Sequence, residues 1–388
     1  MKKTSLLLIT CITFCSTLIA QDKKDAPKWD VSNPQGTYKD VNFTTSEGTW
    51  MNLDVSPDGK EIIFDLLGDI YTMPVTGGTA TVLRSGHAFE VQPRFSPDGK
   101  KILFTSDAGG GDNIWVMNRD GSKATQVTKE SFRLLNNAAW SPDGEYIVAR
   151  KHFTSSRSLG AGEMWMYHIS GGGALQLTVR KNDQQDVNEP VCSPHRRYVY
   201  YSEDMYPGGF FQYNKDPNNQ IFVIKRFDRE KGTNETVTGG PGGAVRPQVS
   251  HDGKWLGFVK RVRTKTVLYI KDLANGEEWP VYDGLSKDQQ EAWSVFGLYT
   301  GYSFTPDDKN IIIWSYGKIL KVDLNGANKA AEIPFTCHVK QRLYEVPRYQ
   351  QELNPETFTA HVIRNAVTSP DGKTLLFNAA GYLWKKAL

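Results

Sequence analysis

A short polar turn that recurs seven times constrains the fold of this chain more than any other feature. The turn is usually Ser-Pro-Asp-Gly, and its copies begin at Ser56, Ser96, Ser141, Ser193, Ser250, Thr305 and Ser369. The steps between the copies are 40, 45, 52, 57, 55 and 64 residues. A repeat of about 40 to 50 residues built from strands and turns is typical of a β-propeller, whose blades are four-stranded sheets. The longer later steps indicate loops inserted between strands.

The residues of the turn suit a tight hairpin. In the first copy, Pro57 presets its own φ, Ser56 and Asp58 can bond nearby backbone amides, and Gly59 accepts a positive φ without steric cost. Three copies have drifted from the pattern, and two of them carry a histidine, His195 or His251. The drifted copies keep enough turn-forming residues for a hairpin, so we interpret both histidines as turn substituents.

Apolar strand patterns follow each turn. The first strand after the turn alternates, as in Glu61–Phe64 and Lys101–Phe104, and another strand with an aromatic residue comes next, as in Asn113–Met117. A glycine turn and an outer strand then complete the repeat. No stretch with a helical period rivals these short period-two runs. The sequence therefore predicts an all-β fold, a β-propeller of about seven four-stranded blades.

The closure of the ring is left open by the sequence. The seventh repeat reaches Leu388 after its third strand, so the last blade is expected to be incomplete or to be closed by an N-terminal strand. The segment Tyr38–Thr45, with its alternation around Phe43, could supply that strand and remove two exposed sheet edges. Alternatively, the chain is a fragment of a longer protein in which further repeats and a catalytic domain follow. Both explanations can hold together.

The N-terminal residues predict export. Lys2 and Lys3 precede an apolar run, and the small residue Ala20 stands where a signal peptidase would cleave. We therefore expect a signal peptide at 1–20, an N-terminal extension with the closing strand at 21–48 and the propeller at 49–388, in a periplasmic or secreted protein. Without Lys2 and Lys3 the chain has 44 basic and 43 acidic residues, a balance that offers no general attraction for nucleic acid or for a membrane surface.

The sequence lacks the common motifs of catalytic, metal-binding and phosphate-binding sites. It has no Gly-x-Ser-x-Gly, His-Glu-x-x-His or phosphate-binding Gly-rich motif, and no two of its seven histidines stand two positions apart, as the metal site of an amidohydrolase would need. We therefore expect no catalytic residue, no metal ligand and no cofactor in this chain.

Two groups of residues are candidates for binding. The first group stands four residues before the turns, where inner strands begin near one mouth of the central channel, and consists of Asn52, Gln92, Asn137, Glu189, Arg246 and Asn365. These side chains could form a ring that contacts a peptide, a small molecule or a partner domain, or they could only satisfy polar groups at strand ends. The second group, Phe210, Phe211 and Tyr213, lies in a long insertion and could cap the channel, dock a partner or pack on the next blade.

The Pro-Asp-Gly turn followed by a strand and an Ile-Trp-type strand resembles the repeat of TolB-like propellers. The segments Trp279–Tyr282 and Tyr299–Tyr302 are most similar to the leading propeller of secreted bacterial amidohydrolase-family proteins. The resemblance implies a non-catalytic binding, scaffold or substrate-gating module whose partner is its own missing C-terminal catalytic domain. Two alternatives are a free-standing periplasmic interaction protein like TolB, with a periplasmic protein partner, and the propeller filter domain of a serine peptidase.

Overall fold

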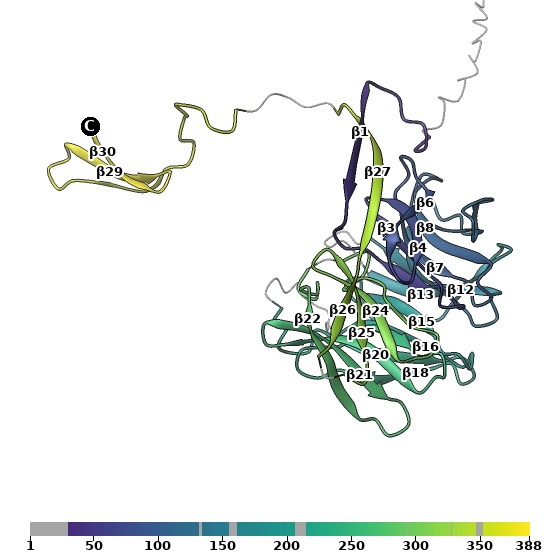
Figure 1. The fold of residues 1–388 in the computed structure, drawn as a ribbon. Helices are drawn as coiled ribbons and strands as arrows, with labels where there is room; N and C mark the ends of the chain where they lie inside the picture. Colours follow the sequence, from purple (N-terminus) through teal and green to yellow (C-terminus); the bar gives the residue numbers. More distant parts are fainter. Residues whose placement is uncertain are drawn as a thin grey trace, which may run out of the picture. The chain divides into compact units, whose positions relative to one another are not determined.

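Strands are the only regular structure of the described part of the chain. The structure is a computed structural model and describes residues 30–131, 134–154, 161–205, 215–292, 294–326, 328–346 and 352–388. Within these ranges six sheets have four strands each, and the strands of a sheet pair antiparallel in chain order from the inner to the outer strand (Figure 1). The predicted all-β fold is confirmed. The predicted signal peptide lies outside the described residues.

The strands of the six blades have the following bounds. The first three blades are β2 (Leu53–Val55), β3 (Glu61–Leu66), β4 (Asp69–Pro74) and β6 (Thr81–Arg84); β7 (Glu90–Phe95), β8 (Lys101–Ser106), β9 (Asn113–Asn118) and β10 (Thr125–Gln126); and β11 (Leu134–Trp140), β12 (Tyr146–Phe153), β13 (Ala161–His168) and β14 (Ala174–Gln176). The next three blades are β15 (Val187–Cys192), β16 (Tyr198–Asp204), β17 (Phe222–Asp228) and β18 (Thr233–Thr238); β19 (Val245–Val249), β20 (Trp255–Val262), β21 (Lys265–Asp272) and β22 (Glu278–Leu285); and β23 (Ser303–Phe304), β24 (Asn310–Ser315), β25 (Lys318–Asp323) and β26 (Ala330–Ile333).

The recurrent turn joins the first two strands of each blade through its own hydrogen bonds. In the first blade, the Ser56 hydroxyl donates to Asp58 Oδ1 at 2.6 Å and accepts from the Glu61 amide at 2.9 Å. The Gly59 amide donates to the Ser56 carbonyl at 2.8 Å, and Gly59 has a φ of 67°. The side-chain bonds replace the ladder bonds that the chain loses where it reverses, which explains why this tetrapeptide recurs.

Neighbouring turns interlock through their proline and glycine residues. A Cβ placed on Gly99 would lie 3.5 Å from the ring of Pro57 in the preceding blade. A Cβ on Gly59 of the first turn would lie 3.4 Å from Pro306 of the sixth turn. The first and sixth turns are therefore neighbours, and the six turns close a cycle.

The turns that depart from Ser-Pro-Asp-Gly also contact a neighbouring turn, and they do so through polar or charged side chains. Arg196 Nη1 lies 3.6 Å from Asp143 Oδ2 of the preceding turn, and His251 Nδ1 lies 2.8 Å from Asp308 Oδ1 of the next. A Cβ on Gly253 would lie 3.0 Å from His195 Nε2. Both histidines thus occupy turn positions and contact an adjacent turn.

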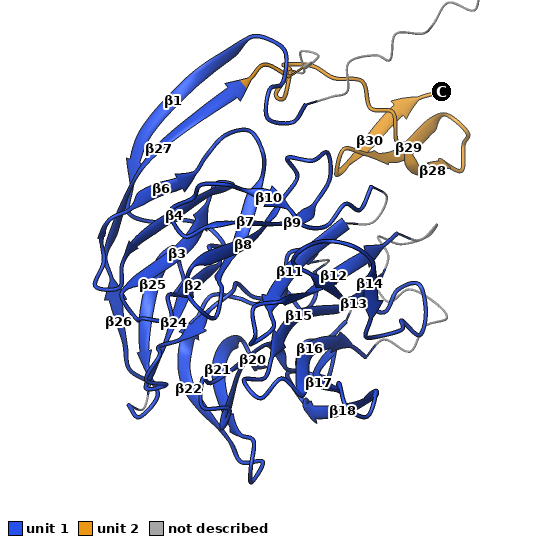
Figure 2. Ribbon diagram, turned by 90° about the vertical axis from the view of Figure 1, so that its right-hand side faces the viewer, with its two compact units in different colours: residues 1–343 blue, residues 344–388 orange. Residues whose placement is uncertain are grey.

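Six sheets complete the ring of the first compact unit, residues 1–343. Successive blades contact each other through β3 and β7, β8 and β11, β11 and β15, β15 and β19, and β19 and β23, and β2 contacts β23. Figure 2 shows β2, β7, β11 and β15 around the centre of this unit. Met51 and Leu53 of the first blade share one buried apolar cluster with Phe304 and Ile311 of the sixth. The ring therefore closes on apolar contacts between chain segments about 250 residues apart in sequence.

The seventh repeat folds into a sheet of its own. It forms a three-stranded sheet of β28 (Arg364–Thr368), β29 (Thr374–Ala379) and β30 (Tyr382–Ala387) in a second compact unit, residues 344–388. The fourth strand is missing from this sheet, as expected for an incomplete last blade.

The N-terminal strand does not complete the last sheet. A strand does form at the expected place, β1 (Tyr38–Thr45), but its hydrogen-bonded neighbour is β27 (Phe335–Tyr344), which pairs in turn with β5 (Gly78–Thr79). Arg342 of β27 holds this pairing, because its Nε bonds Asp40 Oδ1 at 2.8 Å and its guanidinium lies 3.8 Å from the centre of the Tyr38 ring. The alternative in which Tyr38–Thr45 closes the last blade is therefore corrected.

Candidate functional site: a polar ring around a central segment

Five of the predicted ring residues meet at the centre of the first unit, and we call their side chains the polar ring. They are Asn52, Gln92, Asn137, Glu189 and Arg246, and each is at most 5 % exposed. Asn365 lies in the second unit, where its Nδ2 bonds Asn378 of its own sheet at 3.3 Å. Phe210, Phe211 and Tyr213 lie outside the described residues.

A local distortion of the inner strands aims these side chains. Gln92, Asn137, Glu189 and Arg246 have φ values of 60°, 49°, 60° and 55°, in the left-handed region. At each of these positions the pairing with the second strand of the blade shifts its register. A bulge of this kind redirects a side chain, and a non-glycine residue in the left-handed region costs about 1–2 kcal/mol. The same strain at the same repeat position in four blades indicates that the contacts of these side chains offset it.

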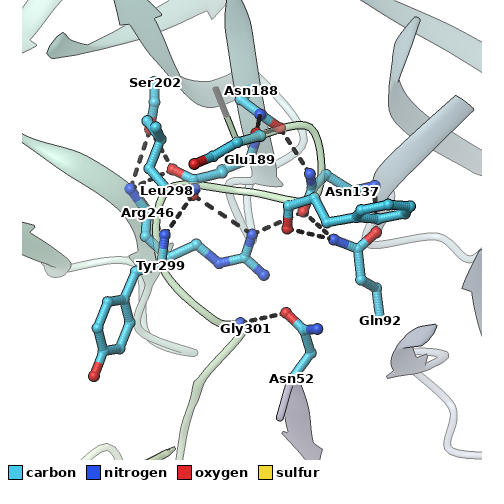
Figure 3. Close-up of polar contacts among 12 residues, drawn as sticks. Asn52, Gln92, Asn137, Asn188, Glu189, Ser202, Arg246, Leu298, Tyr299 and Gly301 are labelled. Atoms are coloured by element: carbon cyan, nitrogen blue, oxygen red, sulfur yellow. Dashed lines mark hydrogen bonds and ion pairs between the residues drawn. The ribbon is translucent and has the colours of Figure 1, made fainter. Parts of the chain in front are cut away.

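The amide side chains of the ring form a chain of hydrogen bonds across adjacent blades (Figure 3). Gln92 Nε2 donates to Asn137 Oδ1 at 2.6 Å, and Asn137 Nδ2 donates to Asn188 Oδ1 at 2.7 Å. Arg246 Nη1 also donates to Asn137 Oδ1, at 3.0 Å. These bonds fix the orientation of the Gln92, Asn137 and Asn188 amides, and each of the three presents a donor toward the centre.

A backbone segment of the chain occupies the centre of the ring, and we call residues Ser294–Gly301 the central segment. It belongs to the connection between β22 and β23. The carbonyls of residues 294, 295 and 296 accept from Asn188, Asn137 and Gln92 at 3.2, 3.4 and 2.8 Å. The Gly301 amide donates to Asn52 Oδ1 at 2.8 Å. The ring thus binds main-chain atoms of this segment.

Glu189 holds the second half of the central segment. Its Oε1 accepts from the amides of Leu298 and Tyr299, and its Oε2 accepts from the Arg246 amide at 2.6 Å and from the Ser202 hydroxyl at 2.7 Å. Four donors thus satisfy both oxygens of one fully buried carboxylate.

Two other charged groups of the centre are strongly desolvated. Burial lowers the pKa of Arg246 to about 10, although Glu189, 3.9 Å away, opposes this shift. Burial likewise raises the pKa of Asp65 to about 6, while hydrogen bonds from Gln92 and Asn52 act against it. Both groups remain mostly charged at neutral pH, so the centre contains compensated buried charge.

Sequence reasoning missed the partners of the ring. Asp65 stands 13 positions after Asn52, the offset at which Thr105 bonds Gln92 and Ser202 bonds Glu189, so this spacing could have found it. Nothing in the sequence marks the central segment as the occupant of the ring. For that segment, the only available signal was the step of 55 residues before Thr305, which exceeds the typical blade length and so contains an insertion. Among the residues that the structure describes, no group of three or more His, Cys, Asp or Glu side chains could hold a metal ion, and no helix is long and apolar enough to cross a membrane.

Comparisons with known proteins place this fold. A family model described as the Tricorn protease N-terminal beta propeller domain matches residues 51–160. An uncharacterized protein of Agrobacterium fabrum is 30 % identical over 151 residues, which cover 36 % of this chain and 50 % of that protein. The Tol-Pal system protein TolB of Wolinella succinogenes is 34 % identical over 116 residues, which cover 29 % of this chain and 27 % of that protein.

A solved structure has a similar fold. The structure of a putative TolB from Agrobacterium tumefaciens has a TM-score of 0.53 and 17 % sequence identity, and the match covers 70 % of this chain and 96 % of that one. The chain spans half or less of the length of the curated relatives named above. The predicted β-propeller fold is confirmed, and the chain is similar in sequence to TolB proteins.

Proposed function

We propose that this TolB-like β-propeller is a non-catalytic binding module that holds main-chain atoms of a polypeptide at the centre of its ring. One observation supports the proposal: polar side chains from four blades direct their hydrogen bonds at backbone carbonyls and amides of a single segment. Side chains that contact only backbone atoms recognise the course of the main chain and tolerate many sequences.

We further propose that the chain is exported and is the front part of an amidohydrolase-like hydrolase. The alternatives are a free-standing periplasmic interaction protein, which the similarity to TolB favours, and the filter domain of a peptidase, which the match to the tricorn propeller favours. Sequencing the gene beyond the codon of Leu388 separates them. A continuation with His-x-His supports the hydrolase, a continuation with Gly-x-Ser-x-Gly supports the peptidase, and an immediate stop codon supports the free-standing protein.

Site-specific photo-crosslinking in an exporting bacterium tests the binding role. A crosslinking amino acid replaces Phe89, which is 44 % exposed and contacts the central segment through Phe296, with ring centres 5.6 Å apart. Exposed Lys100 on the interlocked turns is the matched control. We expect one reproducible protein adduct from position 89 and none from position 100. Equal labelling from both positions, or none from either, would contradict the proposal.

The non-catalytic part has its own test. The purified chain is assayed with chromogenic amide and peptide substrates, with and without added Zn²⁺. We expect no turnover above the buffer rate, and metal-dependent hydrolysis would refute this part.

A further inference from the structure

Three side-chain amides in adjacent blades bind three consecutive backbone carbonyls. We call Gln92, Asn137 and Asn188 the amide triad; they lie on β7, β11 and β15 and donate to the carbonyls of residues 296, 295 and 294, respectively. Blades taken in chain order thus bind the three carbonyls in reverse chain order. None of the side chains of residues 294–297 forms a hydrogen bond with the triad among the described contacts, so the triad binds the backbone of this segment alone.

The occupant of the triad is an excursion of the chain whose ends meet. The Gln289 amide donates to the Leu298 carbonyl at 2.9 Å, which brings the two ends of residues 290–297 together. Beyond this point, Leu298 and Tyr299 are buried in the main apolar cluster. Ser294, Val295 and Phe296 are only partly buried, and among described residues they take part in no ion pair. Residues 294–296 can therefore leave the triad while Gln290 and Glu291, which bond Gly242 and Arg261, and the second half of the central segment keep their places.

We propose that the amide triad is a binding site for three consecutive carbonyls in a turn of a partner peptide and that Ser294–Phe296, which forms such a turn with Gly297, is a built-in occupant which the partner replaces. This inference rests on the proposed binding function and adds to it the ligand class and a mode of regulation. The triad presents uncharged donors to the carbonyls, so it selects peptide backbone rather than an anionic group.

The neighbourhood of the triad also sets one side-chain preference. The Phe296 ring contacts Phe89 edge-on, with ring centres 5.6 Å apart. The residue whose carbonyl binds Gln92 thus places its side chain against an aromatic ring. A partner peptide is expected to carry an aromatic residue at the third of the three positions.

A deletion of residues 291–296 in the full chain tests the inference. The deletion leaves Gln290 and Gly297 as a two-residue connection between Gln289 and Leu298, which suits a tight hairpin because glycine is its second residue. The probe is the peptide acetyl-Ser-Val-Phe-Gly-amide, measured by calorimetric titration. We expect its Kd to be at least ten-fold lower for the deletion variant than for the wild type, and no binding when the variant also carries Gln92→Met. Equal affinity for both chains, or no binding to a deletion variant that keeps the wild-type near-UV spectrum and Tm, would overturn the proposal.

A second measurement covers the case in which the deletion variant does not fold. In the intact chain, Ser294→Cys reports the opening of the excursion through its rate of thiol labelling, above the background of the four native cysteines, Cys11, Cys15, Cys192 and Cys337. We expect Gln92→Met to raise this rate at least ten-fold because it removes one of the three donors, and an unchanged rate would overturn the proposal. These outcomes are independent of the crosslinking at position 89, which tests the binding function itself.

Discussion

The substitution Glu189→Gln probes the most strongly bonded side chain of the ring. The glutamate carboxylate is fully buried and accepts two donors on each oxygen, the amides of Leu298 and Tyr299 on Oε1 and the Arg246 amide and Ser202 hydroxyl on Oε2. Glutamine has almost the same shape, but one of its two terminal atoms is an NH₂ donor. One pair of donors therefore faces another donor, and the buried Arg246 loses its compensating charge.

The expected cost of this change is large. Removing one member of a buried charged pair costs about 3–5 kcal/mol, out of a total stability of about 5–15 kcal/mol for a folded protein. We expect Glu189→Gln to lower the free energy of unfolding by about 3–5 kcal/mol, measured by urea titration with tryptophan fluorescence. The matched control Glu145→Gln, on an exposed turn residue, should change it by less than about 0.5 kcal/mol.

A double-mutant cycle isolates the charge pair. In the variant with both Glu189→Gln and Arg246→Met, neither member of the pair remains buried without the other, so the cost should fall short of the sum of the single costs by about 1–3 kcal/mol. Additive costs, or a single Glu189→Gln cost below about 1 kcal/mol, would refute the view that this carboxylate organises the centre of the ring.

Three further predictions concern pH, backbone space and ring closure. Burial and the nearby Glu90 raise the pKa of Asp69 from 3.8 to about 7. The contribution of Asp69 to stability is therefore complete below about pH 4 and is lost as the pH rises to about 7. Asp69→Asn should flatten this part of the profile of stability against pH, and an unchanged profile would contradict the raised pKa. Gly242→Ala places a Cβ 1.8 Å from the Arg261 carbonyl oxygen and should lower the free energy of unfolding in urea by more than about 3 kcal/mol. The control Gly240→Ala has a similar φ and no atom within 4 Å of its Cβ, so it should cost only about 1 kcal/mol. Equal costs would count against the close approach of Gly242 to Arg261. A chain truncated after Tyr344 should keep the Tm of the first unit within about 2 °C by calorimetry, because six sheets close the ring without the seventh repeat, and a failure to fold would show that closure needs it.

The sequence by itself determined the local structure of this protein. Ser-Pro-Asp-Gly forms the same turn in every exact copy because its hydrogen bonds join residues at most five positions apart, as between Ser56 and Glu61. The strands likewise follow from a local pattern, because their apolar alternation involves residues that are close together in the sequence. The positions of the ring residues also followed from the repeat, because an equal offset from each turn places Gln92, Asn137 and Arg246 at equivalent points of three blades.

Only the tertiary structure decided how many sheets close the ring and what its centre holds. The contact between Pro306 and Gly59 and the bond between Glu189 and Leu298 join residues far apart in the sequence, 109 positions in the second case. A strand such as Tyr38–Thr45 has edges that can pair with any free edge, so its pattern predicts the strand but not its neighbour β27. Packing of whole sheets against one another selects among these alternatives, and a local pattern does not contain that information.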